Sequence, residues 1–217
     1  MKLTDREGLS QTIRQAQAGD QQAAALLLDV CRSYVHVQAQ RHLHSKLAPR
    51  VDASDIAQQT LLDAWQGIEG FRGKSTGELV AWLKTIVQRN AIDAARQHQA
   101  AGKRALDREL PPPRPSEAET TRLPQELADP TQTPSQRVVQ AEEELLLADA
   151  IARLPADYQQ VLICRSLLRM PFSQVAREMN RSGPAVQMLW ARAVEQLRRT
   201  LSSRDPDRVQ PRPETSA

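Results

Sequence analysis

The stretch Pro171–Arg199 constrains this chain most, because it reads as two helices joined by a turn of three or four residues. Its first half has apolar residues at i, i+3, i+4 and i+7, the spacing of one helix face. The polar run 180–183 supplies turn formers: Asn180 tolerates left-handed backbone, and Ser182 can cap the second helix. Pro184 falls in that helix's first turn, where its missing N–H costs little. The second helix continues the inward stripe with Val186, Leu189, Trp190, Ala193 and Leu197.

This spacing favours a helix-turn-helix, whose second helix enters the major groove of DNA. Basic residues dominate around that helix: Arg181, Arg192, Arg198 and Arg199 stand against the single acid Glu195. An ordinary αα-hairpin inside a helical bundle would show the same apolar pattern, so the stretch alone leaves both interpretations open.

Composition predicts an all-α protein of one or two domains. The 217 residues contain only 3% aromatic residues, and Val/Ile alternation is scarce, whereas Ala, Leu, Gln and Arg are abundant. The net charge of +3 is small, but Arg72–Arg104 holds seven Lys/Arg and two acids. Such an excess of positive charge can bind phosphates, or it can simply belong to a helix face exposed to solvent.

Several kinds of site are not expected. Cys31 and Cys164 each lie in an apolar helical run and suggest buried, reduced thiols of a cytoplasmic protein. His42 and His44 lack the i, i+4 spacing of helical metal ligands. We therefore expect no metal site and no cofactor, and the absence of a catalytic constellation argues against an enzyme. Neither a signal core nor an apolar run of eighteen residues is present, so we expect no membrane insertion.

The N-terminal half reads as a series of helices. Periodicity predicts helices over Leu9–Gly19 and Gln21–Leu47, and Pro49 ends the second. Asp52 or Ser54 can cap a third, whose inward face would be Ile56, Thr60, Leu61, Ala64, Trp65 and Ile68. Its other face is a candidate partner surface, although the face on its own favours the simpler interpretation of a single exposed Leu. That face comprises Asp55, Gln58, Gln59, Leu62 and Asp63.

A glycine-rich loop, 69–77, precedes a basic helix. Four glycines in and around it indicate a mobile or tightly turning segment. The following helix has Leu79, Leu83 and Val87 inward and leaves polar and basic side chains for a partner. Arg, Lys, Asn and Gln are the side chains that reach phosphates and base edges.

A change in composition divides the chain. Residues 101–137 contain seven of the fourteen prolines and no apolar period, which is typical of a linker. Helical periodicity returns at Val138 and breaks at Leu154-Pro155. We expect a first domain over 9–100, a second over 138–201 and a disordered tail over 202–217.

Three motifs together resemble an extracytoplasmic-function (ECF) sigma factor of the sigma-70 family. DASDIAQQTLLDAW (52–65) is similar to region 2.2, and FRGKSTGELVAWLKTIVQRNAIDAAR (71–96) to regions 2.3 and 2.4. LPADYQQVLICRSLL (154–168) with the helix-turn-helix resembles region 4. The resemblance covers nearly all of 10–200 and implies RNA polymerase core and promoter DNA as partners. It leaves open whether an anti-sigma factor also binds.

The resemblance implies three sets of site residues. Contact with the β′ clamp helices of polymerase would involve Asp55, Gln58, Gln59, Leu62 and Asp63. The −10 promoter element would be bound by Arg72, Lys74, Lys84, Gln88, Arg89 and Arg96. The −35 element would be bound by Arg181, Ser182, Gln187, Met188 and Arg192, in a domain that also touches the β flap.

Two other functions fit parts of the pattern. A helix-turn-helix regulator would bind DNA without core polymerase, and a helical adaptor would have no role on DNA. The 52–65 motif beside a basic helix argues against both. On polymerase, a tethered pair of domains would meet both promoter elements at once, which is an effective-concentration effect.

Overall fold

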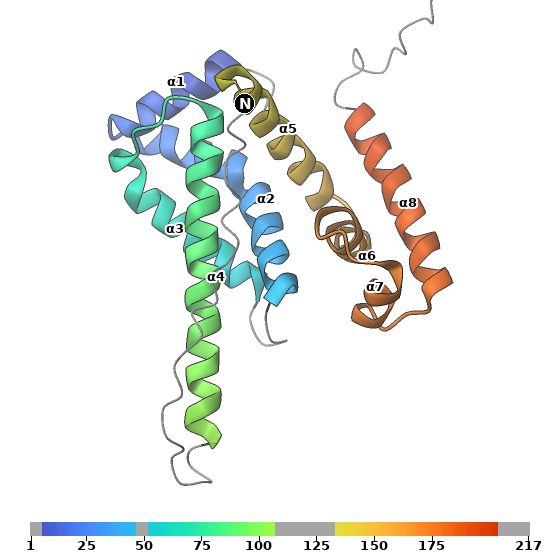
Figure 1. The fold of residues 1–217 in the computed structure, drawn as a ribbon. Coiled ribbons are helices and arrows are strands. Elements are labelled where there is room, and N and C mark those ends of the chain that lie inside the picture. The colour runs from blue at the N-terminus through green and yellow to red at the C-terminus, as the bar shows by residue number, and fades with distance from the viewer. Residues whose placement is uncertain (1–5, 47–51, 107–132, 204–217) are drawn as a thin grey trace, which may run out of the picture.

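The structure is a computed structural model that describes residues 6–46, 52–106 and 133–203. Every regular element in these ranges is helical, which confirms the expected all-α class (Figure 1). The termini 1–5 and 204–217 and the segments 47–51 and 107–132 lie outside the described residues, and so does nearly all of the predicted tail.

The N-terminal half is a four-helix bundle. Its elements are α1 (Arg6–Gln17), α2 (Gln21–Lys46), α3 (Ala53–Gly67), the short 3₁₀ helix η1 (Ile68–Gly70) and α4 (Thr76–Leu106). Helix α2 packs against α1, α3 and α4, and α3 also packs against α4. The predicted break after the first helix is confirmed, because Gly19 has the positive φ of 89° that glycine tolerates best. The predicted inward residues Leu27, Cys31 and Val35 are fully buried in α2.

The C-terminal half begins earlier than the sequence suggested. Its elements are α5 (Pro134–Ala152), α6 (Ala156–Leu162), the π-helical turn η2 (Ile163–Leu167), α7 (Phe172–Glu178) and α8 (Gly183–Ser202). Thr133 and Gln136 form a reciprocal capping box, and Pro134 follows the cap, where a proline is favoured. The prediction that helix returns at Val138 was therefore wrong by one turn. Because α4 also extends to Leu106, the stretch between the two helices is shorter than 101–137.

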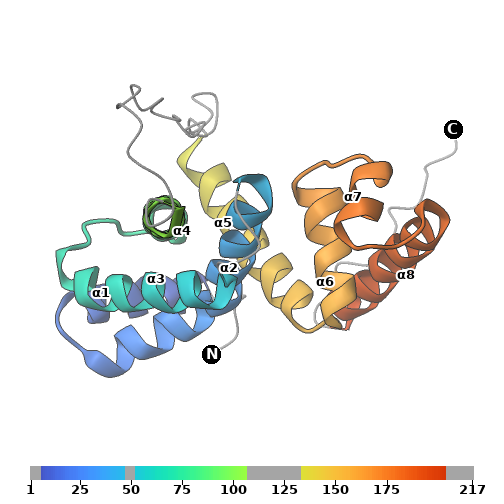
Figure 2. The same ribbon diagram turned by 90° about the horizontal axis from the view of Figure 1, so that it is seen from below.

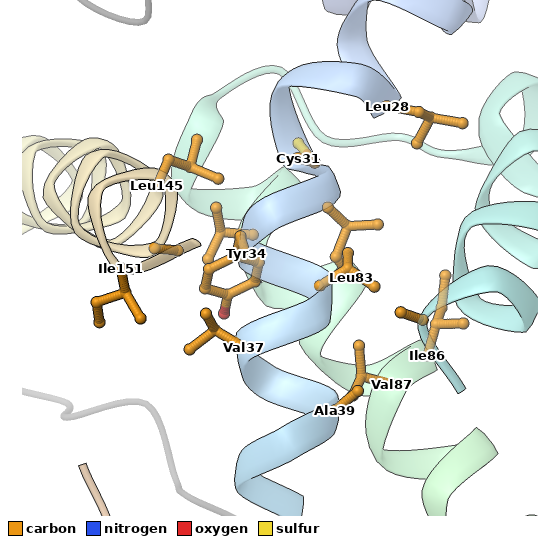
Figure 3. Packing of buried hydrophobic residues seen from close by; sticks show 14 of the residues in the cluster. Leu28, Cys31, Tyr34, Val37, Ala39, Leu83, Ile86, Val87, Leu145 and Ile151 are labelled. Carbon is orange, nitrogen blue, oxygen red and sulfur yellow. The ribbon is translucent and has the colours of Figure 1, made fainter. Parts of the chain in front are cut away.

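Helix α5 joins the two halves into one core. It packs against α2 and α4 on one side and against α6 and α8 on the other (Figures 1 and 2). Its buried residues Ala141, Leu145 and Ala148 recur at i, i+4 and i+7, so they form a single stripe along the helix. Figure 3 shows Leu145 and Ile151 of α5 beside Tyr34 of α2, within a single cluster of buried side chains.

The two cysteines are buried free thiols, as expected. Burial raises the pKa of Cys31 to about 12, and burial together with the charge of Glu178 raises the pKa of Cys164 to about 11. Among the described residues, no group of His, Cys, Asp or Glu could hold a metal ion. None of the described helices is sufficiently long and apolar to cross a membrane.

Candidate nucleic-acid and partner interfaces

The outer face of α3 carries two exposed apolar side chains. Asp52 caps the helix by accepting a hydrogen bond from the Ser54 backbone N–H at 2.8 Å. Leu62 is 50% exposed, and Trp65, three residues later, is 40% exposed. The prediction that Trp65 faces inward was wrong: the buried face consists of Ile56, Ala57, Thr60 and Ala64, and Trp65 is not part of it. Side chains three apart share a helix face, so Leu62 and Trp65 form one apolar patch on the surface.

The polar residues of the predicted partner face divide into two kinds. Asp55, Gln58 and Gln59 are exposed. Asp63 is only partly exposed, because its carboxylate is held by three side chains. It accepts hydrogen bonds from Gln59 Nε2 at 2.7 Å, Asn90 Nδ2 at 3.0 Å and Arg89 Nη2 at 2.9 Å.

Asp63 thus connects the two predicted sites of the N-terminal half. Arg89 and Asn90 lie on α4, and Asn90 also donates to Thr60 Oγ1 of α3 at 3.2 Å. The charge pair of Asp63 and Arg89 leaves the arginine side chain 61% exposed. The α3–α4 contact therefore orients a basic side chain that still faces solvent.

Asp63 should make the stability of the bundle depend on acid pH. Burial alone would raise the pKa of its carboxyl, but the hydrogen bonds from Asn90, Gln59 and Arg89 and the charge of Arg89 outweigh it and lower the pKa below the ordinary 3.8. Because the folded-state pKa is depressed, the stabilisation is complete at pH values above the unfolded pKa and is lost as pH falls through the folded value.

We expect Asp63→Asn to lower the thermal midpoint at neutral pH, and this difference from wild type to shrink in acid, as the pH falls below the ordinary carboxyl pKa of 3.8. Thermal unfolding followed by circular dichroism at both pH values measures the effect. Asp93→Asn, which removes an exposed carboxylate from the middle of α4, is the matched control and should leave the midpoint nearly unchanged. A wild-type advantage over Asp63→Asn that persists undiminished in acid would contradict this role of the carboxylate.

The glycine-rich loop is held by contacts with α1 and α4. Gln17 of α1 donates through Nε2 to the carbonyl oxygens of Phe71 (2.8 Å) and Gly73 (2.7 Å). The Phe71 ring stacks on Trp82 of α4, with centroids 4.8 Å apart. A Cβ on Gly73 would lie 2.3 Å from Phe71 Cζ and 2.7 Å from Glu78 Cβ, so only glycine fits there. Residues 71–74 run without a regular turn, and the chain bends at Ser75 before α4 begins.

Glu78 fixes the end of the loop to the start of α4. Its Oε2 accepts hydrogen bonds from the backbone N–H of Lys74 (2.8 Å) and of Ser75 (3.1 Å), and Ser75 Oγ in turn accepts from the Glu78 N–H. This is a capping box, and the backbone bond from Lys74 is the largest cause that lowers the pKa of the Glu78 carboxyl.

The predicted −10 residues spread over this loop and α4. Arg72 and Lys74 are exposed on the loop. Lys84 and Gln88 are half-buried one helical turn apart on α4, and Arg96 is exposed further along, 4.0 Å from Asp93. These side chains are spread along the loop and α4 and are not gathered at one point.

The helix-turn-helix forms as predicted. Asn180 has a φ of 49°, in the left-handed region, and Ser182 caps α8 by accepting from the Ala185 N–H at 3.4 Å. Val186 and Ala193 are fully buried on α8. The residues on the other side of the helix and at its cap are exposed: Ser182, Ala185, Gln187, Met188, Ala191, Arg192 and Glu195.

Two of the predicted −35 residues make contacts within the protein that stabilise the helix-turn-helix. Arg181 donates through Nη2 to Asp157 of α6 at 2.6 Å, and the Ser182 hydroxyl is the cap of α8. Gln187, Met188 and Arg192 lie on the exposed surface, and Met188 is 58% exposed. A hollow of about 380 Å³ lies at the turn, lined by Ala176, Arg177, Asn180, Arg181 and Ser182.

Sequence reasoning missed several positioning residues. The Ser75-x-x-Glu78 pattern is a capping-box signature that could have been recognised. Gln17 and Asn90 had no local signal, because their partners lie 54 and 27 residues away along the chain.

Comparison with known proteins finds two family models that match this chain. Residues 26–101 match the family model Sigma-70 region 2, and residues 144–197 match Sigma-70, region 4. Together the matches cover more than half of the chain. The first contains α3 and most of α4, and the second contains the helix-turn-helix.

Two curated relatives are named as RNA polymerase sigma factors. The probable RNA polymerase sigma factor RfaY of Xanthomonas campestris pv. campestris is 27% identical over 190 residues, which span 87% of this chain and 43% of the relative. The ECF RNA polymerase sigma-E factor of Haemophilus influenzae is 26% identical over 169 residues, 77% of this chain and 82% of the relative.

A solved structure titled as an RsbN–BldN complex shares 22% identity, with a TM-score of 0.30, over 86% of this chain and 97% of that one. Structural similarity at that score carries no argument, so the family of this chain is shown by the sequence matches alone. With both sigma regions in order, the chain belongs to the ECF group of the sigma-70 family.

Proposed function

We propose that this chain is an ECF sigma factor that directs bacterial core RNA polymerase to specific promoters in the cytoplasm. The observation that carries the proposal is the presence in one chain of the two matched sigma regions, each with an exposed and suitable surface. Polymerase performs the chemistry, and the factor supplies binding energy and position.

The outer face of α3 is the proposed contact with the β′ clamp helices. Leu62 and Trp65 give it an exposed apolar centre, and Asp55, Gln58 and Gln59 give it a polar rim. Interfaces commonly combine an apolar centre with such a rim. Asp63 contributes by holding Arg89 and Asn90, and the C-terminal helices would contact the β flap.

The loop 71–75 and α4 are the proposed −10 surface. Arg72 and Lys74 lie on the loop that contacts from Gln17, Trp82 and Glu78 hold in place. A base flipped out of the duplex costs a few kcal/mol in lost stacking. Because the loop is already ordered, contacts to that base need not also offset the entropy of ordering the loop.

The exposed face of α8 is the proposed −35 surface. Gln187 can pair with an adenine edge, Met188 can contact a thymine methyl group, and Arg192 can contact a guanine or a phosphate. Gln187→Ala and Met188→Ala should each cost about 1–3 kcal/mol and relax preference at one base position. If Arg192 contacts a phosphate, Arg192→Ala should weaken all sequences alike.

Transcription from a library of randomised −35 elements measures both kinds of effect. Gln196→Ala, an exposed residue further along α8 and outside the predicted set, is the control and should preserve the base preferences. Base preferences identical to wild type in all three predicted-site variants would mean that α8 does not read the −35 element.

The alternative, a regulator that acts without polymerase, is not favoured by the two matched sigma regions. It predicts tight, sequence-specific binding to DNA by the purified chain alone, whereas a sigma factor binds promoters tightly only with core polymerase. A band-shift titration of the upstream region, with and without core polymerase, separates the two.

A further inference from the structure

One side chain of α1, Gln17, holds the loop 71–75 at two points. Its Nε2 donates to the carbonyl oxygen of Phe71 at 2.8 Å and to the carbonyl oxygen of Gly73 at 2.7 Å. A side-chain amide nitrogen carries two N–H donors, so both of them are used on this loop. The bonds join residues 54 and 56 apart along the chain, and they connect the last residue of α1 to the loop that leads into α4. Figure 1 shows α1 at the end of the bundle where this loop joins η1 to α4.

The two carbonyl groups lie on either side of Arg72. The Phe71 oxygen belongs to the peptide unit before Arg72, and the Gly73 oxygen belongs to the peptide unit that leads into Lys74. The N–H of this second unit, on Lys74, donates to Glu78 Oε2 of α4 at 2.8 Å. Because a peptide unit is planar, holding its oxygen from α1 and its N–H from α4 fixes the orientation of the whole unit. The backbone that carries Arg72 and Lys74 is therefore held between two helices.

Contacts within the loop leave this backbone little freedom to move. The Phe71 ring is buried and stacks on Trp82, with the two ring centroids 4.8 Å apart. A Cβ on Gly73 would lie 2.3 Å from Phe71 Cζ, so the ring fills the space beside the backbone. Arg72 and Lys74, in contrast, are exposed. The two hydrogen bonds from α1 thus fix the backbone beneath two cationic side chains that face solvent.

Gln17 lies in α1, which ends before residues 26–101, the stretch that matches the Sigma-70 region 2 model. We propose that Gln17 is a positioning residue for the −10 element: it fixes the backbone around Arg72, so that Arg72 and Lys74 meet an unstacked base in one orientation. This inference rests on the proposed function, in which the loop 71–75 contacts the −10 element. A loop that is held before DNA binds loses little further conformational entropy when it contacts a base, so the contact to that base is stronger.

Gln17→Glu and Gln17→Met remove the two N–H donors in different ways. The carboxylate of Gln17→Glu has the size of the amide but only acceptors, so it would face two carbonyl oxygens and would no longer hold the loop. Gln17→Met has a similar length, no charge and no N–H donor, and it carries the test if circular dichroism shows that the first variant unfolds. Gln15→Glu and Gln15→Met are the matched controls, because Gln15 is exposed in the same last turn of α1. At both positions a carboxylate opposes the helix dipole in the same way.

The test measures how much each base of the −10 element contributes to binding. The full chain is assembled with core polymerase, and the holoenzyme is titrated with single-stranded −10 oligonucleotides, each lacking one base at a different position. Wild type and both Gln15 variants should lose about tenfold in affinity when the base contacted by the loop is absent. With the Gln17 variants the same abasic site should cost less than about twofold, since the contact is already lost. Abasic sites elsewhere should cost as much as in wild type.

A purely structural role of Gln17 would give a different pattern. Binding by the Gln17 variants would then weaken by one common factor for every oligonucleotide, and the relative costs of the abasic sites would equal those of wild type. That result, or unchanged binding by Gln17→Met, would overturn the proposal. Failure of the proposed function looks different: the wild-type holoenzyme itself would bind all of the abasic oligonucleotides alike. That outcome would remove the role of the loop in −10 binding and this inference with it.

Discussion

Replacing Leu62 with lysine is expected to weaken binding to core polymerase by about 30-fold or more, because truncating or charging an interface hot spot costs about 2 kcal/mol or more. Leu62 is half exposed at the centre of the α3 face, beside Trp65. A lysine there would place an ammonium group within an apolar contact, and the loss of affinity would be seen by titrating labelled factor with core enzyme. The fold should be unaffected, since the side chain is not part of the core.

Leu26→Lys provides the matched control for Leu62→Lys. Leu26 is 53% exposed on α2 of the same bundle, so the chemical change and the solvent exposure are nearly equal. We expect Leu26→Lys to bind core polymerase like wild type and Trp65→Ala to lose affinity in the same direction as Leu62→Lys. Equal binding by Leu62→Lys and Leu26→Lys, with normal helicity in both, would exclude the α3 face as the polymerase contact.

Gly73→Ala is expected to destabilise the N-terminal bundle by about 1–3 kcal/mol, as overpacking usually does, and to impair promoter opening. The added methyl group would lie 2.3 Å from Phe71 Cζ and 2.7 Å from Glu78 Cβ. Phe71 would have to leave its stack on Trp82, or the Glu78 cap would have to move. Either shift displaces the loop that carries Arg72 and Lys74. Thermal unfolding measures the first effect, and the fluorescence of 2-aminopurine in the −10 element measures the second.

Gly70→Ala introduces the same methyl group three residues earlier, where it would have no atom within 4 Å. It should retain wild-type stability and promoter opening. If Gly73→Ala matched Gly70→Ala in both measurements, the tight geometry of this loop would have no role in either.

The parts of the fold that sequence could predict are those set by local chemistry. The turn between α7 and α8 depends on Asn180, the Ser182 cap and Pro184, all within five residues of one another. The outward face of α8 likewise follows from the 3.6-residue period alone. These elements needed no knowledge of the rest of the chain.

The parts that sequence could not predict depend on contacts between distant segments. The hydrophobicity of Trp65 predicts a core residue. The buried face of α3 is instead made of smaller side chains such as Thr60 and Ala64. The Asp63–Arg89 pair and the docking of α5 join residues far apart along the chain. Helical periodicity indicates which face of a helix is apolar, but not which neighbour will cover it.

Run-off transcription tests the central claim most directly. Purified chain, core RNA polymerase and a linear template that carries a promoter upstream of the chain's own coding region are combined, and transcripts are sized. We predict a discrete transcript that requires both the chain and core polymerase and that disappears with Leu62→Lys but not with Leu26→Lys. Tight, specific binding of the chain alone to the template, without any chain-dependent transcript, would contradict the assignment as a sigma factor.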